Sequence, residues 1–190
     1  MFLQILTSKS SWLFDNKKEV LKNLKEIKDK ITINIISNSN KISKKADIIF
    51  VLSYYKIISK SHLKKNNNIY VIHDSNLPNG RGMSPLFNQI LKGKRDIIST
   101  VFKCEENIDD GKIAFKKNFY YPDNIVYDEI KKLQIKNNII LIKKFIFLFK
   151  KKKIKLKNEI EYMDKIIGKV KFGIRKEEVN SKIFKRTKTD

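Results

Sequence analysis

The sequence contains little cysteine and little histidine, and each shortage excludes a kind of site. Cys104 is the single cysteine, so the chain forms no internal disulfide and no paired-cysteine metal motif. This composition is typical of a reducing compartment. The two histidines, His62 and His73, are separated by a predicted strand and have no cysteine beside them, so we expect no metal.

Arginine is also scarce, although the chain is strongly basic. Lysine and arginine total 42 against 20 acidic residues, which gives a net charge of +22, and such a surface attracts polyanions. The arginines, which bind guanine and phosphate through a planar fork, number only four: Arg81, Arg95, Arg175 and Arg186. Because the lysines are scattered through a sequence that is also rich in isoleucine and asparagine, the codon bias of an AT-rich genome explains them, and we do not expect nucleic acid as the partner. A selected polyanion-binding surface remains the alternative.

Long apolar runs are absent as well. No segment reaches the roughly 18 uninterrupted apolar residues of a membrane span. The best candidate, residues 139–149, is broken by Lys143 and Lys144. Residues 1–6 carry no cationic leader and no cleavage site, so they indicate a strand and not a signal peptide. We therefore expect a cytoplasmic protein that does not enter a membrane.

Short runs rich in isoleucine and valine alternate with amphipathic stretches along most of the chain. This pattern predicts an α/β fold, with a mostly parallel sheet and helices on both of its faces. The predicted strands are residues 2–6, 31–36, 47–52, 69–73, 97–102 and 113–115.

Three helices are predicted between and after these strands. Asp15 is the expected cap of the first, and Ser84, Pro85 and Gly93 have the residue types that begin and end the second. A third helical pattern covers about residues 123–149. The inward-facing residues are expected to be Val20, Leu21, Leu24 and Ile27 in the first helix and Phe87, Ile90 and Leu91 in the second.

The pattern divides the chain into a compact domain, residues 1–150, and a lysine-rich extension, residues 151–190. A small hairpin, an arm that pairs two copies in a homodimer, and an irregular tail are all compatible with the extension.

His73 ends a predicted strand, and a loop rich in glycine and proline follows at once. Ligands of open α/β sheets bind beyond the carboxyl ends of the strands. A histidine at a strand end is by itself more often a structural hydrogen-bonding group. The loop at residues 73–85, whose backbone N–H groups can converge, favours a site.

Two motifs carry a resemblance to a known family. The stretch HDSNLPNGRGMSP, residues 73–85, resembles the signature loop of the folate-dependent formyltransferases. The stretch EENIDDGKI, residues 105–113, is similar to the acidic loop of the same family, with Asp109 and Gly111 in the matching places. The resemblance implies a Rossmann-like formyltransferase fold, with 10-formyltetrahydrofolate as formyl donor.

The resemblance also implies roles for individual residues. His73 would donate a hydrogen bond to the oxyanion, and Asp109 would be its partner and proton shuttle. A weaker match at residues 47–59 is explained equally well by a buried strand and a short helix. The implied folate-pocket residues are Tyr55, Lys56, Ile57, Ile58 and Ile108. The implied acceptor-binding residues are Ser8, Ser10, Ser75, Asn76 and Arg81.

Val71 departs from the family pattern, which has an asparagine two residues before the histidine. Losing such a donor typically costs on the order of 3 kcal/mol of transition-state stabilisation. Asn76 is a candidate replacement. A subgroup similar to the sugar N-formyltransferases has an aliphatic residue at this place.

The implied acceptor is therefore a nucleotide-linked amino sugar. Methionyl-tRNA is less expected, because few residues follow position 150 to build a tRNA-binding domain. A catalytically inactive, formyltransferase-like binding protein and a basic RNA-associated protein are the two alternatives.

Overall fold

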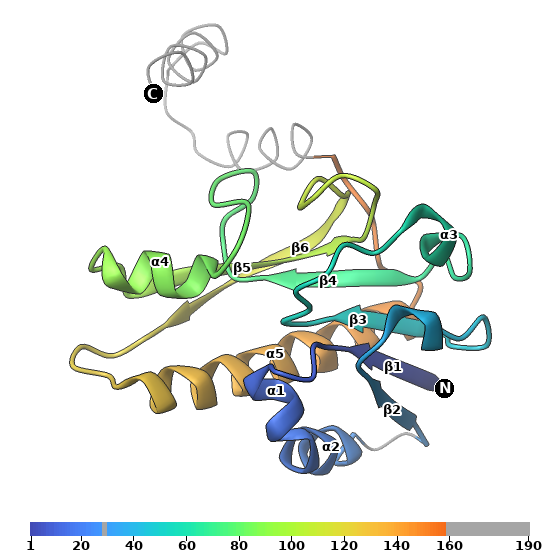
Figure 1. Cartoon of the computed structure of the whole chain (residues 1–190), viewed down its shortest axis with the longest axis horizontal. Coiled ribbons are helices and arrows are strands. Elements are labelled where there is room, and N and C mark those ends of the chain that lie inside the picture. Colours follow the sequence, from blue (N-terminus) through green and yellow to red (C-terminus); the bar gives the residue numbers. More distant parts are fainter. Residues whose placement is uncertain (28–29, 159–190) are drawn as a thin grey trace, which may run out of the picture. The chain divides into compact units, whose positions relative to one another are not determined.

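One sheet of six strands organises the chain, as Figure 1 shows for the computed structural model, which describes residues 1–27 and 30–158. The strand order is β2-β1-β3-β4-β5-β6. The strands are β1 (Phe2–Leu6), β2 (Thr32–Ile36), β3 (Ile48–Val51), β4 (Ile69–His73), β5 (Asp96–Lys103) and β6 (Ile113–Tyr120). Strands β1 to β4 pair in parallel, whereas β5 pairs antiparallel with both β4 and β6. The predicted α/β class and mostly parallel sheet are confirmed.

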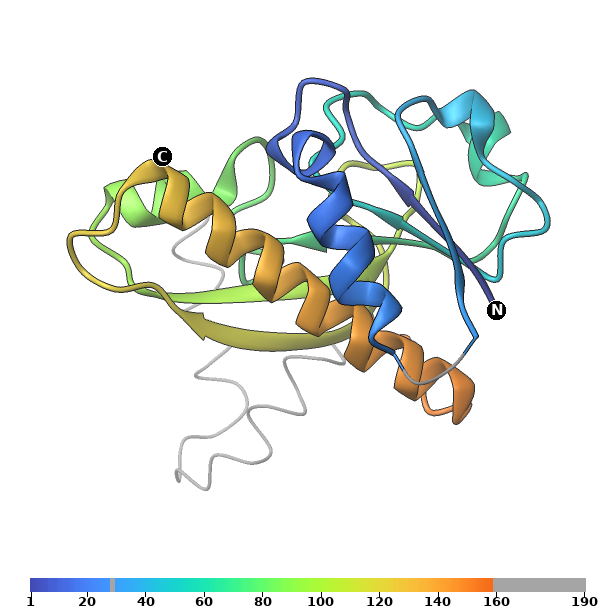
Figure 2. The same ribbon diagram turned by 90° about the horizontal axis from the view of Figure 1, so that it is seen from below.

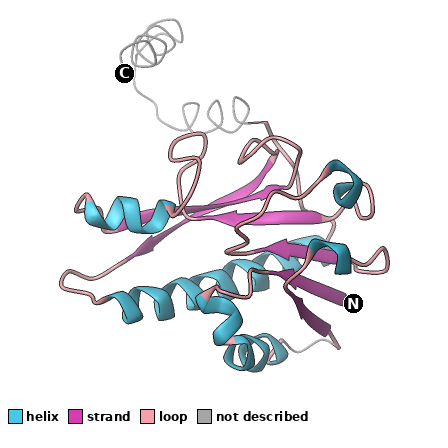
Figure 3. Cartoon of the chain, in the orientation of Figure 1, coloured by secondary structure: helices cyan, strands magenta, loops and turns pink. Residues whose placement is uncertain are grey.

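Helices cover both faces of this sheet, as predicted, and Figure 2 shows α2 and α5 crossing one of them. The helices are α1 (Trp12–Asp15), α2 (Lys17–Lys25), the 3₁₀ turn η1 (Ser39–Lys41), α3 (Lys60–Leu63), α4 (Pro85–Leu91) and α5 (Tyr127–Lys150). Figure 3 separates these helices from the strands and loops by colour.

Two buried clusters of apolar side chains lie on the two faces, because side chains alternate along each strand. The first cluster contains Phe50, Tyr70 and residues of α2, α4 and α5. Phe145 of α5 is fully buried there, with its ring centre 5.2 Å from that of Phe50 and 4.4 Å from that of Tyr70. The second cluster contains Ile49 and Val51 and lies on the opposite face. The sheet therefore separates the two clusters, and residues at the strand ends lie where its two faces meet.

The long helix α5 begins where the sequence provides a favourable first turn. The Glu129 carboxylate accepts a hydrogen bond from the Val126 backbone N–H at 3.1 Å. Asp128 and Glu129 also place negative charge at the positive end of the helix dipole.

Three local predictions were wrong. Asp15 does not cap the helix that contains Val20: Asp15 is the last residue of α1, and the N-cap of α2 is Asn16. The side-chain cap in this region belongs to α1, where Ser11 Oγ accepts from the Phe14 N–H at 3.1 Å. Leu91 is 83% exposed, and Leu86 is the buried residue of α4. Strand β6 continues to Tyr120, because pairing with β5 holds its polar stretch at the sheet edge.

The extension predicted at residues 151–190 is described only in part. Lys157 pairs with Ile113 of β6 through two backbone hydrogen bonds, of 2.7 and 3.0 Å. Residues 159–190 lie outside the described residues. Within the described part of the chain, no helix has the length and apolar character needed to cross a membrane.

Candidate active site

A cavity of about 300 Å³ opens at the carboxyl ends of β3 and β4. The cavity is lined by the ends of these strands, the loop at residues 82–84, the first turn of α4, the acidic loop and one face of α5. Because β3 and β4 are parallel, both strands deliver the residues that follow them to the same edge. His73, the last residue of β4, lies at this edge.

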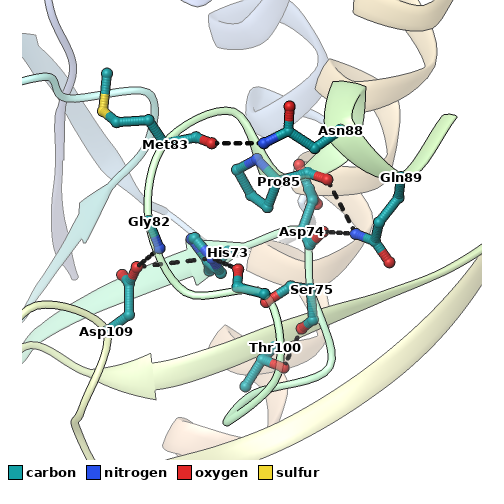
Figure 4. Close-up of polar contacts among 11 residues, drawn as sticks. His73, Asp74, Ser75, Gly82, Met83, Pro85, Asn88, Gln89, Thr100 and Asp109 are labelled. Atoms are coloured by element: carbon teal, nitrogen blue, oxygen red, sulfur yellow. Dashed lines mark hydrogen bonds and ion pairs between the residues drawn. The ribbon is translucent and has the colours of Figure 1, made fainter. Parts of the chain in front are cut away.

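His73 and Asp109 meet in the cavity, and Figure 4 shows their side chains facing each other. His73 Nε2 lies 3.7 Å from Asp109 Oδ2, and the two side chains are only 9% and 13% exposed. His73 Nε2 also lies 2.9 Å from the Gly80 carbonyl oxygen. Since a carbonyl oxygen only accepts hydrogen bonds, Nε2 carries a proton in this arrangement. The structure thus places an N–H donor beside a carboxylate.

The glycine-rich loop holds Asp109 from the other side. The Gly82 N–H donates to Asp109 Oδ2 at 2.8 Å. Asp109 itself has a φ of +53°, a left-handed conformation that asparagine and aspartate adopt more readily than most residues. Next to it, Arg81 Nη2 donates to Asp110 Oδ1 at 2.8 Å. Arg81, a predicted acceptor contact, therefore ties the two loops together.

Gly80 allows this loop to turn back onto β4. Its φ is +75°, and a Cβ atom at this position would lie 2.9 Å from the Ser75 Cβ. Thr100 of β5 donates to the Ser75 carbonyl oxygen at 2.7 Å, which anchors the start of the loop. The Ser75 hydroxyl is buried and has no hydrogen-bond partner among the described residues.

Asn76 does not take the place of the missing family asparagine. Its Oδ1 accepts from Lys116 Nζ at 2.8 Å. Ser75, Asn76 and Arg81 line a neighbouring cavity of about 380 Å³ and not the one that contains His73. Val71 does line the His73 cavity, so an aliphatic side chain faces it there.

Asp74, which was not predicted as a site residue, holds together the elements around the cavity. It is 5% exposed, its Oδ1 accepts from Ser99 Oγ at 2.6 Å, and its Oδ2 accepts from Gln134 Nε2 at 2.7 Å. These bonds join β4 to β5 and α5. Burial raises the pKa of the Tyr121 phenol, and the Asp74 charge raises it further.

The predicted folate residues divide into two groups. Tyr55 and Ile108 line the cavity, and both are largely exposed at its mouth. Lys56, Ile57 and Ile58 do not line it; Ile58 is buried in the second core cluster instead. Ser53, Tyr54 and Tyr55 in the turn after β3 line the cavity, and Ser53 has a φ of +48° there; the chain leaves the cavity after Tyr55.

The two predicted serines after β1 also lie off the cavity. Ser8 Oγ accepts from the Tyr55 N–H at 2.8 Å and so positions the turn that carries Tyr55. Ser10 is exposed.

Sequence reasoning missed the polar face of α5. Lys131, Gln134 and Asn138 line the cavity at a spacing of three and four residues, which places them on one side of the helix. Lys131 Nζ lies 4.6 Å from the centre of the Phe87 ring. Burial lowers the pKa of Lys131, and the negative charge of Asp74 opposes this shift. The sequence feature that could have indicated this face is the spacing of these three polar residues on one side of a helix whose remaining inward residues are apolar.

No group of three or more histidine, cysteine or carboxylate side chains within residues 1–27 and 30–158 is arranged to hold a metal ion. The chemistry available at this edge is that of an imidazole, two carboxylates, amides and an ammonium group. Such groups bind polar substrates and move protons.

Comparisons with known proteins agree with this geometry. The sequence profile described as "Formyl transferase" matches residues 14–135, more than half of the chain. Methionyl-tRNA formyltransferase from Rickettsia rickettsii (strain Iowa) is 34% identical over 97 residues, which are 50% of this chain and 31% of that protein. The match with this curated relative thus spans about a third of the relative's length.

Solved structures share the fold. Methionyl-tRNA formyltransferase from Clostridium thermocellum superposes with a TM-score of 0.60 at 25% identity, over 83% of this chain and 68% of that one. WlaRD, a sugar 3N-formyl transferase solved with dTDP and 5-N-formyl-THF, gives a TM-score of 0.60 at 18% identity, over 83% of this chain and 66% of that one. The family profile and the shared fold lead to one conclusion: this chain belongs to the formyltransferase family.

Proposed function

We propose that the chain transfers a formyl group from 10-formyltetrahydrofolate to a primary amine. The observation that carries the proposal is the approach of His73 Nε2 to within 3.7 Å of Asp109 Oδ2 inside a cavity at the sheet edge. Family membership supports the reaction class, and the folate bound to WlaRD supports the donor. In this proposal residues 1–150 form the catalytic domain, and residues 151–190 form an extension of it.

The cavity fits part of a folate. About 300 Å³ is at the lower limit of small-molecule sites, enough for a flat heterocycle. Val51, Val71 and Ile108 give one side of the cavity an apolar lining. Tyr55 and Met83, both more than half exposed, stand at the mouth, where they would cover the rest of the donor.

The reaction forms a bond between the amine nitrogen and the formyl carbon and breaks the bond between that carbon and the donor nitrogen. His73 Nε2–H donates a hydrogen bond to the oxygen that becomes negative, and for this it turns from the Gly80 carbonyl. Asp109 accepts the proton that the attacking amine loses and returns it to the leaving nitrogen. The Gly82 N–H keeps the carboxylate oriented between these two steps.

A nucleotide-linked amino sugar is the acceptor that we favour. Its pyrophosphate suits a chain with a net charge of +22 and a lysine, Lys131, in the cavity lining. The dTDP in the WlaRD structure supports this choice. Methionyl-tRNA is the second candidate, because the curated relative and the structure at 25% identity are both methionyl-tRNA formyltransferases.

The test is a transfer assay with the wild-type protein, 10-formyltetrahydrofolate and three acceptors: a dTDP-linked 3-amino sugar, methionyl-tRNA and glycinamide ribonucleotide. Mass spectrometry detects the formylated product. Formylation of the amino sugar supports both the reaction and the acceptor that we propose. Formylation of methionyl-tRNA alone supports the reaction and identifies methionyl-tRNA as the acceptor instead.

Two results favour the alternatives. Binding of 5-formyltetrahydrofolate without any product indicates an inactive binding protein. Val71 gives a reason for inactivity, because it lacks the hydrogen-bond donor of the family's asparagine. Absence of folate binding, together with an RNA affinity that falls steeply with salt, indicates an RNA-associated protein and overturns the proposal.

A further inference from the structure

Asn138 of α5 is a buried amide that is not satisfied by the protein. Its side chain is 6% exposed, and Oδ1 has no hydrogen-bond partner among the described residues. Asn138 lines the same cavity as His73 and Asp109. An unpartnered buried carbonyl oxygen destabilises the folded state, so a native protein that keeps one requires an explanation.

The neighbouring amides of α5 have partners in the protein. Gln134 Nε2 donates to Asp74 Oδ2 at 2.7 Å, and Gln134 Oε1 accepts from Lys131 Nζ at 3.3 Å. Asn137 Nδ2 donates to the Tyr121 hydroxyl at 3.1 Å, and Asn137 does not line the cavity. The unsatisfied group is thus the amide that faces the cavity, which points to a ligand.

The cavity has two sides that differ in chemistry. Val51 and Val71 belong to, or pack against, the second core cluster on one face of the sheet. Ile72 and Leu86, with the buried apolar residues of α5, belong to the first cluster on the opposite face. His73 lies at the strand end between the two faces. On the side of the first cluster, Lys131, Gln134 and Asn138 of α5 line the cavity and make that side polar. Val51 and Val71 make the other side apolar.

Formyl transfer joins two molecules at one carbon atom, so donor and acceptor reach His73 from different sides. A flat heterocycle fits the apolar side. The acceptor, which carries hydroxyl and amino groups, fits the side formed by Lys131, Gln134 and Asn138. A hydroxyl or amino group is also the kind of donor that the Asn138 oxygen lacks.

We infer that Asn138 binds the amine acceptor: its carbonyl oxygen accepts a hydrogen bond from a hydroxyl or amino group of that molecule. This inference rests on the proposed function and adds a residue that selects the acceptor. In this assignment Asn138 binds the acceptor, while His73 and Asp109 carry out the formyl transfer.

The experiment compares the Asn138→Leu variant, which keeps the size and removes the amide, with Asn137→Leu as matched control. Both residues are buried asparagines of α5, and only Asn138 faces the cavity. Three quantities are measured: the KM of the acceptor that gives product with the wild type, the Kd of 5-formyltetrahydrofolate, and the Tm. Acceptor binding is also measured by calorimetry with 5-formyltetrahydrofolate present, so transfer is not needed for the comparison.

For Asn138→Leu we expect acceptor binding to weaken at least about tenfold, because a buried donor of the acceptor loses its partner. The folate Kd is unchanged, and the Tm is equal to or above that of the wild type, because the unpartnered oxygen is gone. Asn137→Leu lowers the Tm and leaves acceptor binding within about twofold of the wild type.

Weakened folate binding in Asn138→Leu, or unchanged acceptor binding, overturns the inference while the proposed function stands. A lower Tm with both ligands weakened alike shows a structural role and also overturns it. Failure of the proposed function is distinct, since the wild type itself would then form no product with any acceptor, whether or not it binds 5-formyltetrahydrofolate.

Discussion

Replacing Asp74 by alanine tests whether the cavity is held together by one buried carboxylate. Ser99 Oγ and Gln134 Nε2 donate to its two oxygens at 2.6 and 2.7 Å. Hydrogen bonds to a charged group contribute about 1.5 to 3 kcal/mol each, and a buried donor left without a partner costs about 1 to 3 kcal/mol. We expect Asp74→Ala to lower the free energy of unfolding by about 3 to 5 kcal/mol, because two buried donors lose their acceptor.

The matched control is Asp110→Ala. Asp110 pairs with Arg81 at 2.8 Å, but both side chains are 41% exposed, so the loss is under about 1 kcal/mol. Asp74→Asn keeps the shape and loses about 1 to 2 kcal/mol, since one oxygen can still accept from Ser99. Urea unfolding measures all three variants. Equal stability of Asp74→Ala and Asp110→Ala would refute the reasoning.

Two further predictions concern the acidic loop. Gly111→Ala should destabilise the fold by about 3 kcal/mol or more in urea unfolding, because its Cβ would overlap the Lys103 carbonyl oxygen. Gly93→Ala, which has open space around it and a φ of +77°, should lose only about 1 to 2 kcal/mol. Burial, then the charges of Asp109 and Glu105, raise the pKa of Cys104 to about 11. Alkylation by iodoacetamide should therefore accelerate only as the pH approaches 11, and Asp109→Asn should shift this midpoint to lower pH. A wild-type midpoint near pH 9 would contradict the effect of burial and of these two charges on the Cys104 thiol.

Much of the sheet could be predicted because the buried strands are short segments in which most residues are apolar. Residues 2–6 and 69–73 were predicted to the residue for this reason. Strand β6 was predicted too short, because an edge strand tolerates polar residues and its length depends on its partner β5. In α4, Phe87 and Ile90 pack against the first core cluster as predicted, whereas the prediction for Leu91 was wrong for a related reason. Leu86 and Leu91 are equally apolar, and only the packing decides which one is buried.

The candidate site was predictable where a motif marks it. His73 and Asp109 come from two loops with recognisable sequences, and the structure brings their side chains together. The polar face of α5 has no such motif. Lys131 and Asn138 resemble solvent-exposed positions in the sequence, and only the docking of α5 under the ends of β3 and β4 turns them toward the cavity.

The most direct test of formyl transfer at this site is the single-turnover rate of product formation in His73→Asn and Asp109→Asn, together with the Kd of 5-formyltetrahydrofolate. We expect each variant to lose at least about 100-fold in rate while folate affinity is unchanged. The double variant should be little slower than either single one, because the two residues act as a unit. Transfer at the wild-type rate in the double variant would show that the imidazole and the carboxylate at this edge are not the catalytic pair.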